Sequence, residues 1–508
     1  GGNTGVDFND SVKARFGTGN DLELYHDGTN SVINITAGFL KFRVGNTDRF
    51  EVSGAGIYSP SKIDSGGDIN VYGHVKPWTG YDSTFDLGTN TLRWRNAYVD
   101  TYYGDGSNLT GISISSDAQY NTVAGTNAGD SFSGTSATKN TLFGYDAGTA
   151  ITSADGNTAV GYQALKTATT GGYSTAVGRG ALQKNTATDN TAIGFFASNE
   201  NTSGTNNNSF GQQSGRNTTT GSWNCSFGNL TLNTNQTGNY NTCFGGFALR
   251  NSTSDNNTAI GYNAGVNVTS GQSNTCVGSR AGQSIQTTSS NTCIGDRAGF
   301  TAQGEQNTYV GKNSGYMGGG SQNVGIGYLA LRGHSSGGAG SYNVAVGHES
   351  AYTLSGSNNT LVGNQSGYDL TSGSYNTGIG NAVLYELTTG NYNSVLGRFA
   401  GRRITTGHNN TCIGDEAGDN ITTGSNNLLL GHDATASSVT VSNEVTIGDA
   451  NITKFRIPGI NVTLKDNGGT PTQGHVLTVD GSGEASFAAA SGGVASDSYE
   501  NTVGGTNA

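Results

Sequence analysis

The sequence predicts an all-β chain built around a parallel β-solenoid, and three observations support this fold class. The pattern Asn-Thr-x-apolar-Gly recurs along most of the chain at intervals of about 17 residues, a period that suits one solenoid turn. Only 33% of the residues are hydrophobic and 12% are charged, while 83 of 508 are glycine, which leaves too little apolar side chain for conventional layered domains. The 23 tyrosines and 18 phenylalanines are nevertheless more than a disordered coil usually carries.

Residues 1–115 are expected to form small β-rich modules and a linker. Two apolar stretches, residues 22–35 and 39–52, are each interrupted by a turn pair, Asp-Gly in the first and Gly-Asn in the second, which is typical of hairpins. Trp94 lies between two arginines. We interpret it as packing at a joint of the rod, with binding of a partner or a sugar as the alternative.

Residues 116–450 are expected to form the solenoid itself. Its turns are marked by nineteen glycines, which are Gly144, Gly161, Gly178, Gly194, Gly211, Gly228, Gly245, Gly261, Gly278, Gly295, Gly311, Gly327, Gly347, Gly363, Gly380, Gly397, Gly414, Gly431 and Gly448. All four prolines of the chain lie outside this array, as expected if each turn donates backbone hydrogen bonds to the next. With about 4.8 Å between neighbouring strands, the array would be a rod roughly 86 Å long.

Each position of the repeat has an expected place. The residue before the glycine is Val, Ile, Leu or Phe in every turn, as at Val160 and Ile193, and is expected to face the interior. The residue three positions after the glycine is usually small, as at Ala164, where backbones would approach closely. Asparagine stands four positions before nearly every glycine, as at Asn157 and Asn257, and stacked amides can form a hydrogen-bonded ladder.

One large apolar residue and one alanine per turn would make a thin core for a single solenoid. Three identical chains around one axis, intertwined or side by side, would bury the apolar positions together and protect the sheet edges. The sequence therefore favours a homotrimer. The hand of the solenoid is left open.

Two stretches of the array carry a resemblance to a known family: Asn-Thr-Ala-Val-Gly-Tyr-Gln-Ala-Leu at 157–165 and Asn-Thr-Ala-Ile-Gly-Tyr-Asn-Ala-Gly at 257–265. They resemble repeats of phage tail-fibre proteins, notably of the marine cyanobacterial phage type. Segments 86–100, 104–112 and 441–449 are similar to linker motifs in such fibres. The repeats also resemble, more distantly, the heads of trimeric autotransporter adhesins, which are trimers of parallel β-rolls. The resemblance implies location in a virion tail fibre, with the bacterial cell surface as the alternative.

The C-terminal part is expected to hold a β-rich connector, residues 451–495, and the start of a further repeat array, residues 496–508. The last segment, Ser-Asp-Ser-Tyr-Glu-Asn-Thr-Val-Gly-Gly-Thr-Asn-Ala, echoes residues 116–128, which open the main array. We therefore expect the natural polypeptide to be longer at both ends.

No residue is assigned a catalytic, cofactor-binding or metal-binding role, and receptor-binding residues stay unknown. Four cysteines share the position two before the glycine, a fifth is one residue off, and all are interpreted as small packing residues with free thiols; they are Cys243, Cys276, Cys293, Cys412 and Cys225. The seven histidines lack ligand spacing.

A tyrosine-rich column directly follows the glycines and is expected to lie on the surface. Its members are Tyr145, Tyr162, Tyr262 and Tyr328, with His348 and His432 in the same position. Such a column could pack at a rim or stack on glycans. No pair of carboxylates stands out for the acid and base of a glycosidase.

The function predicted is that of a structural and adhesive segment of a viral tail fibre, not of an enzyme. The trimeric rod would join other fibre or baseplate proteins and position, or contribute to, the binding of a host surface glycan or protein receptor. A net charge of −11 without a basic run argues against nucleic acid, and no apolar stretch is long enough for membrane insertion.

Two alternatives come from other functional classes. The first is an enzyme, a polysaccharide depolymerase spike. The second is a bacterial surface adhesin or an ice-binding solenoid. Ice binding is considered because Thr158, Thr175 and their equivalents could form a threonine ladder. That ladder breaks at Asn208 and Cys225, among other turns.

Overall fold

The structure, a computed structural model, describes most of the chain. The described residues are 115–457 apart from 134, 135 and 336, together with 11–16, 18, 22–35, 40–44, 47–53, 56–58, 459, 462–465, 475–479, 484–489, 495–496 and 502–503. Trp94 and the motifs at 86–100 and 104–112 lie outside them. Across the described residues the chain is all-β, and none of them belongs to a helix that could span a membrane. Two compact units, Gly1–Gly106 and Ser107–Ala508, are described separately.

The first unit contains two small antiparallel sheets. One has the order β1 (Ala14–Phe16), β2 (Leu22–His26), β3 (Ser31–Ile35), and the other contains β4 (Leu40–Val44), β5 (Thr47–Ser53) and β6 (Gly56–Tyr58). The two hairpins expected from the sequence are the antiparallel pairs β2–β3 and β4–β5. In the first hairpin Asp27 Oδ1 accepts the backbone N–H groups of Thr29 and Asn30, at 2.9 and 2.7 Å, an arrangement that favours a tight turn.

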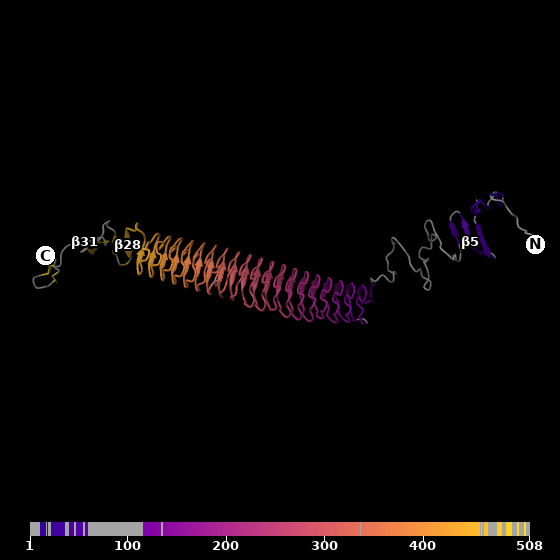
Figure 1. Ribbon diagram of the computed structural model, residues 1–508, viewed down its shortest axis with the longest axis horizontal. Helices are drawn as coiled ribbons and strands as arrows, with labels where there is room; N and C mark the ends of the chain where they lie inside the picture. Colours follow the sequence, from indigo (N-terminus) through magenta and orange to yellow (C-terminus); the bar gives the residue numbers. More distant parts are fainter. Residues whose placement is uncertain are drawn as a thin grey trace, which may run out of the picture. The chain divides into compact units, whose positions relative to one another are not determined.

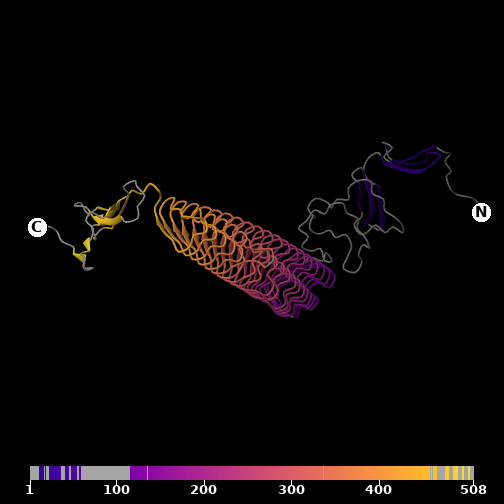
Figure 2. The same cartoon turned by 60° about the vertical axis from the view of Figure 1, so that its left-hand side comes forward.

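The second unit is dominated by the predicted parallel β-solenoid, which has about 19 turns of about 17 residues each. Every turn contributes one three-residue strand to a single sheet that runs the length of the rod (Figures 1 and 2). The strands are β8 (Thr122–Ala124), β9 (Thr141–Phe143), β10 (Thr158–Val160), β11 (Thr175–Val177), β12 (Thr191–Ile193), β13 (Asn208–Phe210), β14 (Cys225–Phe227), β15 (Thr242–Phe244), β16 (Thr258–Ile260), β17 (Thr275–Val277), β18 (Thr292–Ile294), β19 (Thr308–Val310), β20 (Val324–Ile326), β21 (Val344–Val346), β22 (Thr360–Val362), β23 (Thr377–Ile379), β24 (Ser394–Leu396), β25 (Thr411–Ile413), β26 (Leu428–Leu430) and β27 (Val445–Ile447).

The pairing of these strands keeps equivalent residues of successive repeats opposite one another. Thr158 lies opposite Thr175, and Val160 opposite Val177. The same register holds where the intervening segment is longer, as between Val324 and Val344. Each side-chain position of the repeat therefore forms a straight column along the rod.

A short hairpin opens the solenoid, and a small sheet comes after its last turn. β7 (Ser115–Ser116) pairs antiparallel with β8, with Ser116 opposite Thr122. The same register recurs in β32 (Ala495–Ser496) and β33 (Thr502–Val503), where Ser496 lies opposite Thr502. Between them, β28 (Lys454–Ile457), β29 (Val462–Lys465), β31 (Glu484–Ala489) and β30 (His475–Val479) form a sheet in that order.

The glycine column explains why the chain coils so tightly. From Gly144 to Gly431 the glycines that mark the turns have φ between +117° and +147°, which side chains rarely tolerate. Successive glycines also lie against one another: a Cβ added to Gly278 would lie 2.5 Å from the carbonyl oxygen of Gly295. Only glycine fits this position, for conformational and steric reasons together.

The predicted asparagine ladder is present and buried. Asn274 Oδ1 accepts the backbone N–H of Asn291 at 3.0 Å and its Nδ2 at 3.2 Å. Asn291 Oδ1 accepts the equivalent groups of Asn307. Ser174 replaces asparagine in one turn, and its N–H still reaches Asn157 Oδ1 at 3.0 Å. The ladder satisfies interior polar groups that would otherwise be costly to bury.

The single-chain core differs from the prediction at one position. The residue before the glycine faces outward: Val160, Ile260 and Leu396 are 38%, 42% and 48% exposed. The residue two before the glycine is buried instead, as at Ala159, because side chains alternate across a strand. We call this second set the inner column. The predicted small residue three after the glycine is buried, as at Ala164.

The core is apolar along most of the rod but not everywhere. One hydrophobic cluster extends from Ala128 to Ala197 and a second from Leu232 to Ala436. Between Ala197 and Leu232, a stretch that the structure describes in full, no hydrophobic residue is buried. The interior there is lined by hydroxyl groups that bond to one another across turns, those of Ser198, Ser209, Ser214, Ser226 and Thr231.

Candidate association face

The outward side of the long sheet is the most regular surface of the molecule. Two columns occupy its middle: the outer apolar column, which precedes the glycines, and the threonine column two residues earlier. Both columns come from the same strands, so they run side by side along the rod. Within each column, neighbouring side chains are one strand spacing apart, about 4.8 Å. We call these two columns together the outer face.

The outer apolar column is unbroken. It consists of Phe143, Val160, Val177, Ile193, Phe210, Phe227, Phe244, Ile260, Val277, Ile294, Val310, Ile326, Val346, Val362, Ile379, Leu396, Ile413, Leu430 and Ile447. Its most exposed members, such as Leu396 and Ile447, show 48% and 47% of their surface to solvent. A monomer rarely exposes so long a row of apolar side chains unless a partner covers it.

The threonine column is less regular. Threonine occupies most turns, and the residues that stand in its place in the others are Asn208, Cys225, Val324, Val344, Ser394, Leu428 and Val445. None of the replacements carries a charge, so the outer face contains no ionised group from β9 to β27, all of which are described. An uncharged face can be covered without desolvating ions, which is the costly part of burial.

A second aromatic column borders the outer face and was missed at the sequence level. It lies one residue before the asparagine ladder, and we call it the rim column. Its aromatic members in the solenoid are strongly exposed: Tyr120, Tyr173, Trp223, Tyr240, Tyr342, Tyr375 and Tyr392. The residues of this column have positive φ, a conformation in which asparagine is enriched, and asparagine fills several of the other turns, as at Asn206 and Asn256. The regular spacing from the glycines could have identified this column.

The tyrosine column that directly follows the glycines is exposed, as predicted. Its rings pack against rings of neighbouring turns in two geometries, stacked and edge to face. Tyr145 stacks on Tyr162 with ring centres 5.4 Å apart, and Tyr328 stacks on His348 at 5.2 Å. Tyr262 meets Phe247 edge to face at 5.9 Å. Stacked rings present their edges to solvent. Packing of the rings against one another therefore accounts for these pairs better than stacking on sugars.

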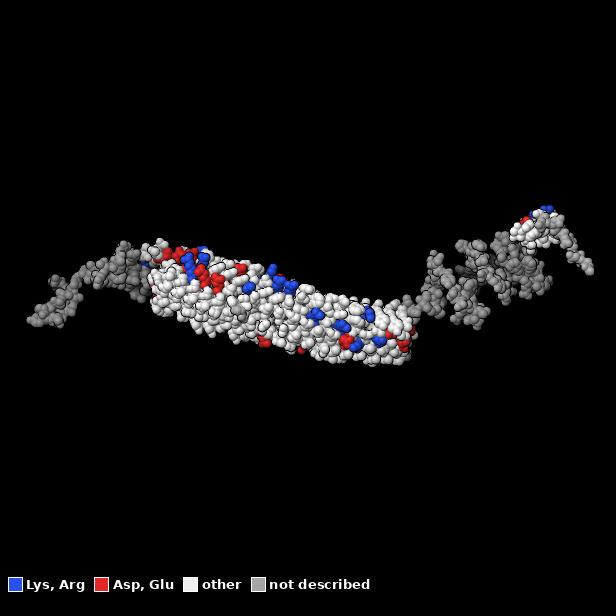
Figure 3. Space-filling model, in the orientation of Figure 1, with Lys and Arg blue, Asp and Glu red and all other residues white. Residues whose placement is uncertain are grey.

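Charged groups lie beside the outer face rather than on it, and several of them pair with one another. Figure 3 shows acidic and basic atoms side by side near the C-terminal end of the rod. There Arg398 Nη2 lies 2.8 Å from Asp415 and 3.2 Å from Glu416. The hydrogen bond from Arg398 lowers the pKa of Asp415 below its usual value. The Asp415 carboxylate is held ionised, which does not suit a general acid.

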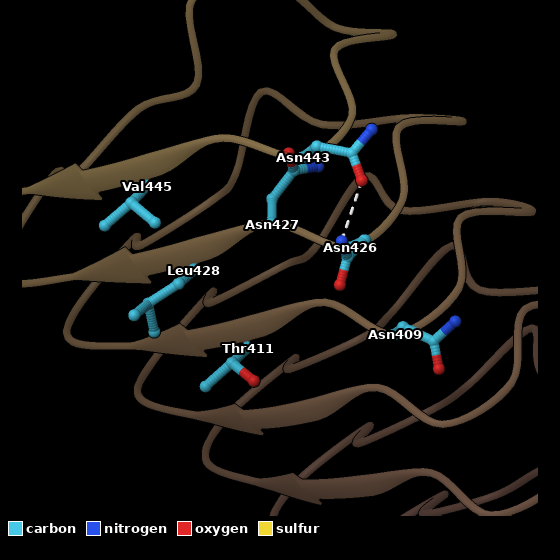
Figure 4. Close-up of a pocket in the computed structure, with 7 residues that line it drawn as sticks. All are labelled: Asn409, Thr411, Asn426, Asn427, Leu428, Asn443 and Val445. Atoms are coloured by element: carbon cyan, nitrogen blue, oxygen red, sulfur yellow. Dashed lines mark hydrogen bonds between the residues drawn. The ribbon is translucent and has the colours of Figure 1, made fainter.

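One open groove lies on the sheet near its C-terminal end, with a volume of about 340 Å³ (Figure 4). Three rim asparagines and three residues of the threonine column line it, with Asn427 of the ladder between them: Asn409, Asn426, Asn443, Thr411, Leu428, Val445 and Asn427. Asn426 Nδ2 donates to Asn443 Oδ1 at 2.7 Å. The lining offers amide hydrogen bonds and no acid or base. Among the described residues, no group of His, Cys, Asp and Glu could hold a metal ion.

The cysteines separate into two kinds. Cys243, Cys276, Cys293 and Cys412 fill the inner column as free, fully buried thiols, in agreement with their interpretation as packing residues. Burial raises the pKa of the Cys412 thiol to about 12. Cys225 is also free but lies on the outer face and is only partly buried. It is the one cysteine of the five that a partner on that face would contact.

Comparisons with known proteins give no relatives: no family model, no curated protein and no solved structure matches the chain. Inference about function therefore rests on the solenoid and its surfaces.

Proposed function

We propose that the chain is a rod segment of a viral tail fibre, in which three parallel copies turn their outer faces toward a common axis. One observation carries the proposal: the outer apolar column has an apolar residue in every turn and is partly exposed throughout. The residue before each glycine was expected to face an interior, yet it faces outward from the single chain. In the proposed trimer it would face an interior shared by three chains.

The size of the outer face supports a permanent partner. Two columns about 7 Å apart over roughly 86 Å cover on the order of 600 Å². That is as large as the largest apolar patch of typical monomers, about 300–600 Å², and approaches the roughly 800 Å² per partner of stable interfaces. The adjoining rim column would add to the buried surface.

The spacing of the outer face supports a second copy of the chain as that partner. Its side chains repeat once per turn along the whole rod. An occupant that matches this repeat at every level must have the same spacing, and another copy aligned in parallel has it by construction. The number three rests on the resemblance to trimeric fibres and adhesins.

The proposed role is to space and present a host-binding region. A stack of hydrogen-bonded turns is stiff along its axis, and the polar and charged sides that face away from the axis remain available for surface glycans or protein receptors. The groove at Asn409–Val445 and the ion pairs around Arg398 supply no acid–base machinery, which favours a structural role over a depolymerase.

Light scattering of the purified chain, with an unboiled detergent gel beside it, tests the proposal. We expect the mass of three chains and resistance to detergent. Ile260→Glu with Ile294→Glu should give monomers, because two charges would be buried at each interface. Ser203→Glu with Thr220→Glu, at exposed turn positions, is the matched control and should stay trimeric. A monomeric parent would refute the proposal.

Ice binding is a second candidate, favoured by the partly exposed threonine column on a parallel sheet. It requires the outer face to be bare, whereas the trimer requires the face to be covered, so the two functions exclude each other. Thermal hysteresis from a monomeric chain would support ice binding. Trimers without thermal hysteresis would support the fibre.

A further inference from the structure

The turns between Ser198 and Thr231 have a different interior from the rest of the solenoid. Inside, hydroxyl groups replace alkyl groups: Ser198 Oγ donates to Ser209 Oγ at 2.7 Å, and Ser214 Oγ donates to Ser226 Oγ at 2.7 Å. The hydroxyls of Ser214 and Thr231 continue the chain at 2.9 Å. These contacts satisfy polar groups but bury little apolar surface, so the interior of these turns contributes less hydrophobic stabilisation.

Outside, these turns and the turn that follows them carry large apolar groups. Phe210, Phe227 and Phe244 stack in consecutive turns, with ring centres 4.3 and 4.7 Å apart. Trp223 and Tyr240 lie in the rim column of the second and third of these turns, across the threonine column from the rings, and are 56% and 59% exposed. We call these five residues the aromatic patch. Along the described solenoid it is the place where both columns carry aromatic residues in successive turns.

The threonine column also changes at this level. Asn208 and Cys225 stand where the turns on either side have Thr191 and Thr242. Among these three turns the middle one, with Trp223, Cys225 and Phe227, departs from the common pattern in all three outward columns. The departure gives this level of the rod a shape and chemistry that no other level shares.

A distinctive level can prevent copies with uniform repeats from slipping out of register. Outside the aromatic patch the face presents Thr together with Val or Ile in ten of its sixteen turns, so much of it fits a copy almost equally well after a slip of one turn, about 4.8 Å. In uniform assemblies one distinctive layer is enough to specify the register, as a single polar residue does in coiled coils. Rings from one chain opposite Val or Ile of another would leave voids on one side and overlaps on the other.

We infer that the aromatic patch locks the copies in register, with the patch of each chain packed against the patches of the other two. This inference rests on the proposed trimer and specifies where its chains recognise one another. The partner of the patch is thus a second copy of this chain at the same level.

The test measures register separately from association. A spin label is attached at Ser203→Cys, an exposed turn position, in the full chain with Cys225→Ser, since the other four cysteines are buried. The patch variant makes these turns resemble the others: Phe210→Ile, Phe227→Ile, Phe244→Ile, Trp223→Asn and Tyr240→Asn. The matched control changes the same columns elsewhere: Ile379→Val, Leu396→Val, Ile413→Val, Tyr375→Asn and Tyr392→Asn. Pulsed electron resonance gives label distances, and light scattering gives mass.

We expect the parent and the control to give the mass of three chains and one narrow distance. The patch variant should keep that mass and show several distances, from copies displaced by whole turns. A single narrow distance in a trimeric patch variant would overturn the inference alone. Dissociation of the patch variant would also overturn it, because association itself would then depend on the patch. A monomeric parent would overturn the proposed trimer first.

Discussion

The turns with the serine-lined interior, Ser198–Thr231, and the apolar turns that come after them from Leu232 onward share one backbone and differ in where their apolar groups lie. Both have the glycine column, the asparagine ladder and the same strand register. In the first region the interior is hydroxyl-lined and the aromatics are outside. In the second, Cys276, Cys293 and Ile285 fill the interior. The difference teaches that backbone contacts define the coil, and the interior tolerates variation if another surface supplies the apolar packing.

Alanine substitutions in the glycine column should have the largest effect on the free energy of unfolding, and the effect should be equal in the two regions. Gly211→Ala and Gly278→Ala each place a Cβ 2.5 Å from the carbonyl oxygen of the next glycine, at φ +125° and +130°. We expect each to lower the free energy of unfolding by at least about 3 kcal/mol, measured by denaturant titration. Gly337→Ala, where a Cβ would meet nothing within 4 Å, is the control and should be nearly neutral. A clear difference between the first two would break the idea of a shared backbone.

The asparagine ladder should also matter equally in both regions. Asn224 Oδ1 accepts the N–H and Nδ2 of Asn241, both at 3.0 Å, and Asn291 Oδ1 does the same for Asn307 at 3.0 and 3.1 Å. Alanine at either position would leave a buried N–H without an acceptor, and we expect a loss of about 2 kcal/mol. Serine, which the chain itself uses at Ser174, should cost less. Equal costs for alanine and serine in denaturant titrations would contradict this expectation.

Substitution in the inner column should separate the two regions. Cys276→Ser would bury a hydroxyl in an apolar interior, and we expect a loss of about 2 kcal/mol. Ser226→Ala should cost nearer to about 1 kcal/mol, because Ser214 keeps the Ser226 carbonyl as an acceptor at 2.8 Å. Thermal or denaturant unfolding of the two variants measures the difference. The reverse order would show that the serine-lined interior is the more demanding of the two.

The smallest expected effect is a difference in thiol reactivity between the buried cysteines and Cys225. Burial raises the pKa of Cys243 and Cys412 above the ordinary thiol value, so both should stay protonated and unreactive at neutral and mildly alkaline pH. Cys225 is only partly buried, and its pKa is also raised by burial. In the monomeric Ile260→Glu, Ile294→Glu variant we expect slow alkylation of one thiol per folded chain, and of all five after denaturation. Labelling of several thiols in folded chains would indicate a looser interior.

The sequence predicts the parts of this fold that the backbone determines. The period, the glycine column, the asparagine ladder and the two N-terminal hairpins follow from residue types with fixed conformational or hydrogen-bonding demands. The orientation of Val160 and its equivalents was predicted wrongly, because a three-residue strand has two apolar or small positions and alternation alone does not say which faces inward. The inner column is often alanine or cysteine, but Leu142 and Tyr309 are buried there as well, so side-chain size does not explain the orientation.

The association face was predictable only in part. The shared core stays a prediction from the apolar content of each turn, and the rim column and the aromatic patch were not predicted. Their residues, Trp223 and Tyr240 among them, stand at a position that most turns fill with polar residues, so the pattern marks it as a turn. Only the alignment of columns along the rod places these rings at the same level as Phe227 and Phe244.

The central claim is that the outer face lies against copies of the same chain. An electron cryo-microscopy map of the purified rod tests it most directly. We predict three parallel solenoids with the columns of Val160 and Thr158 turned toward a common axis and the ion pairs around Arg398 away from it. A solitary solenoid, or an assembly that leaves the outer apolar column facing solvent, would contradict the claim.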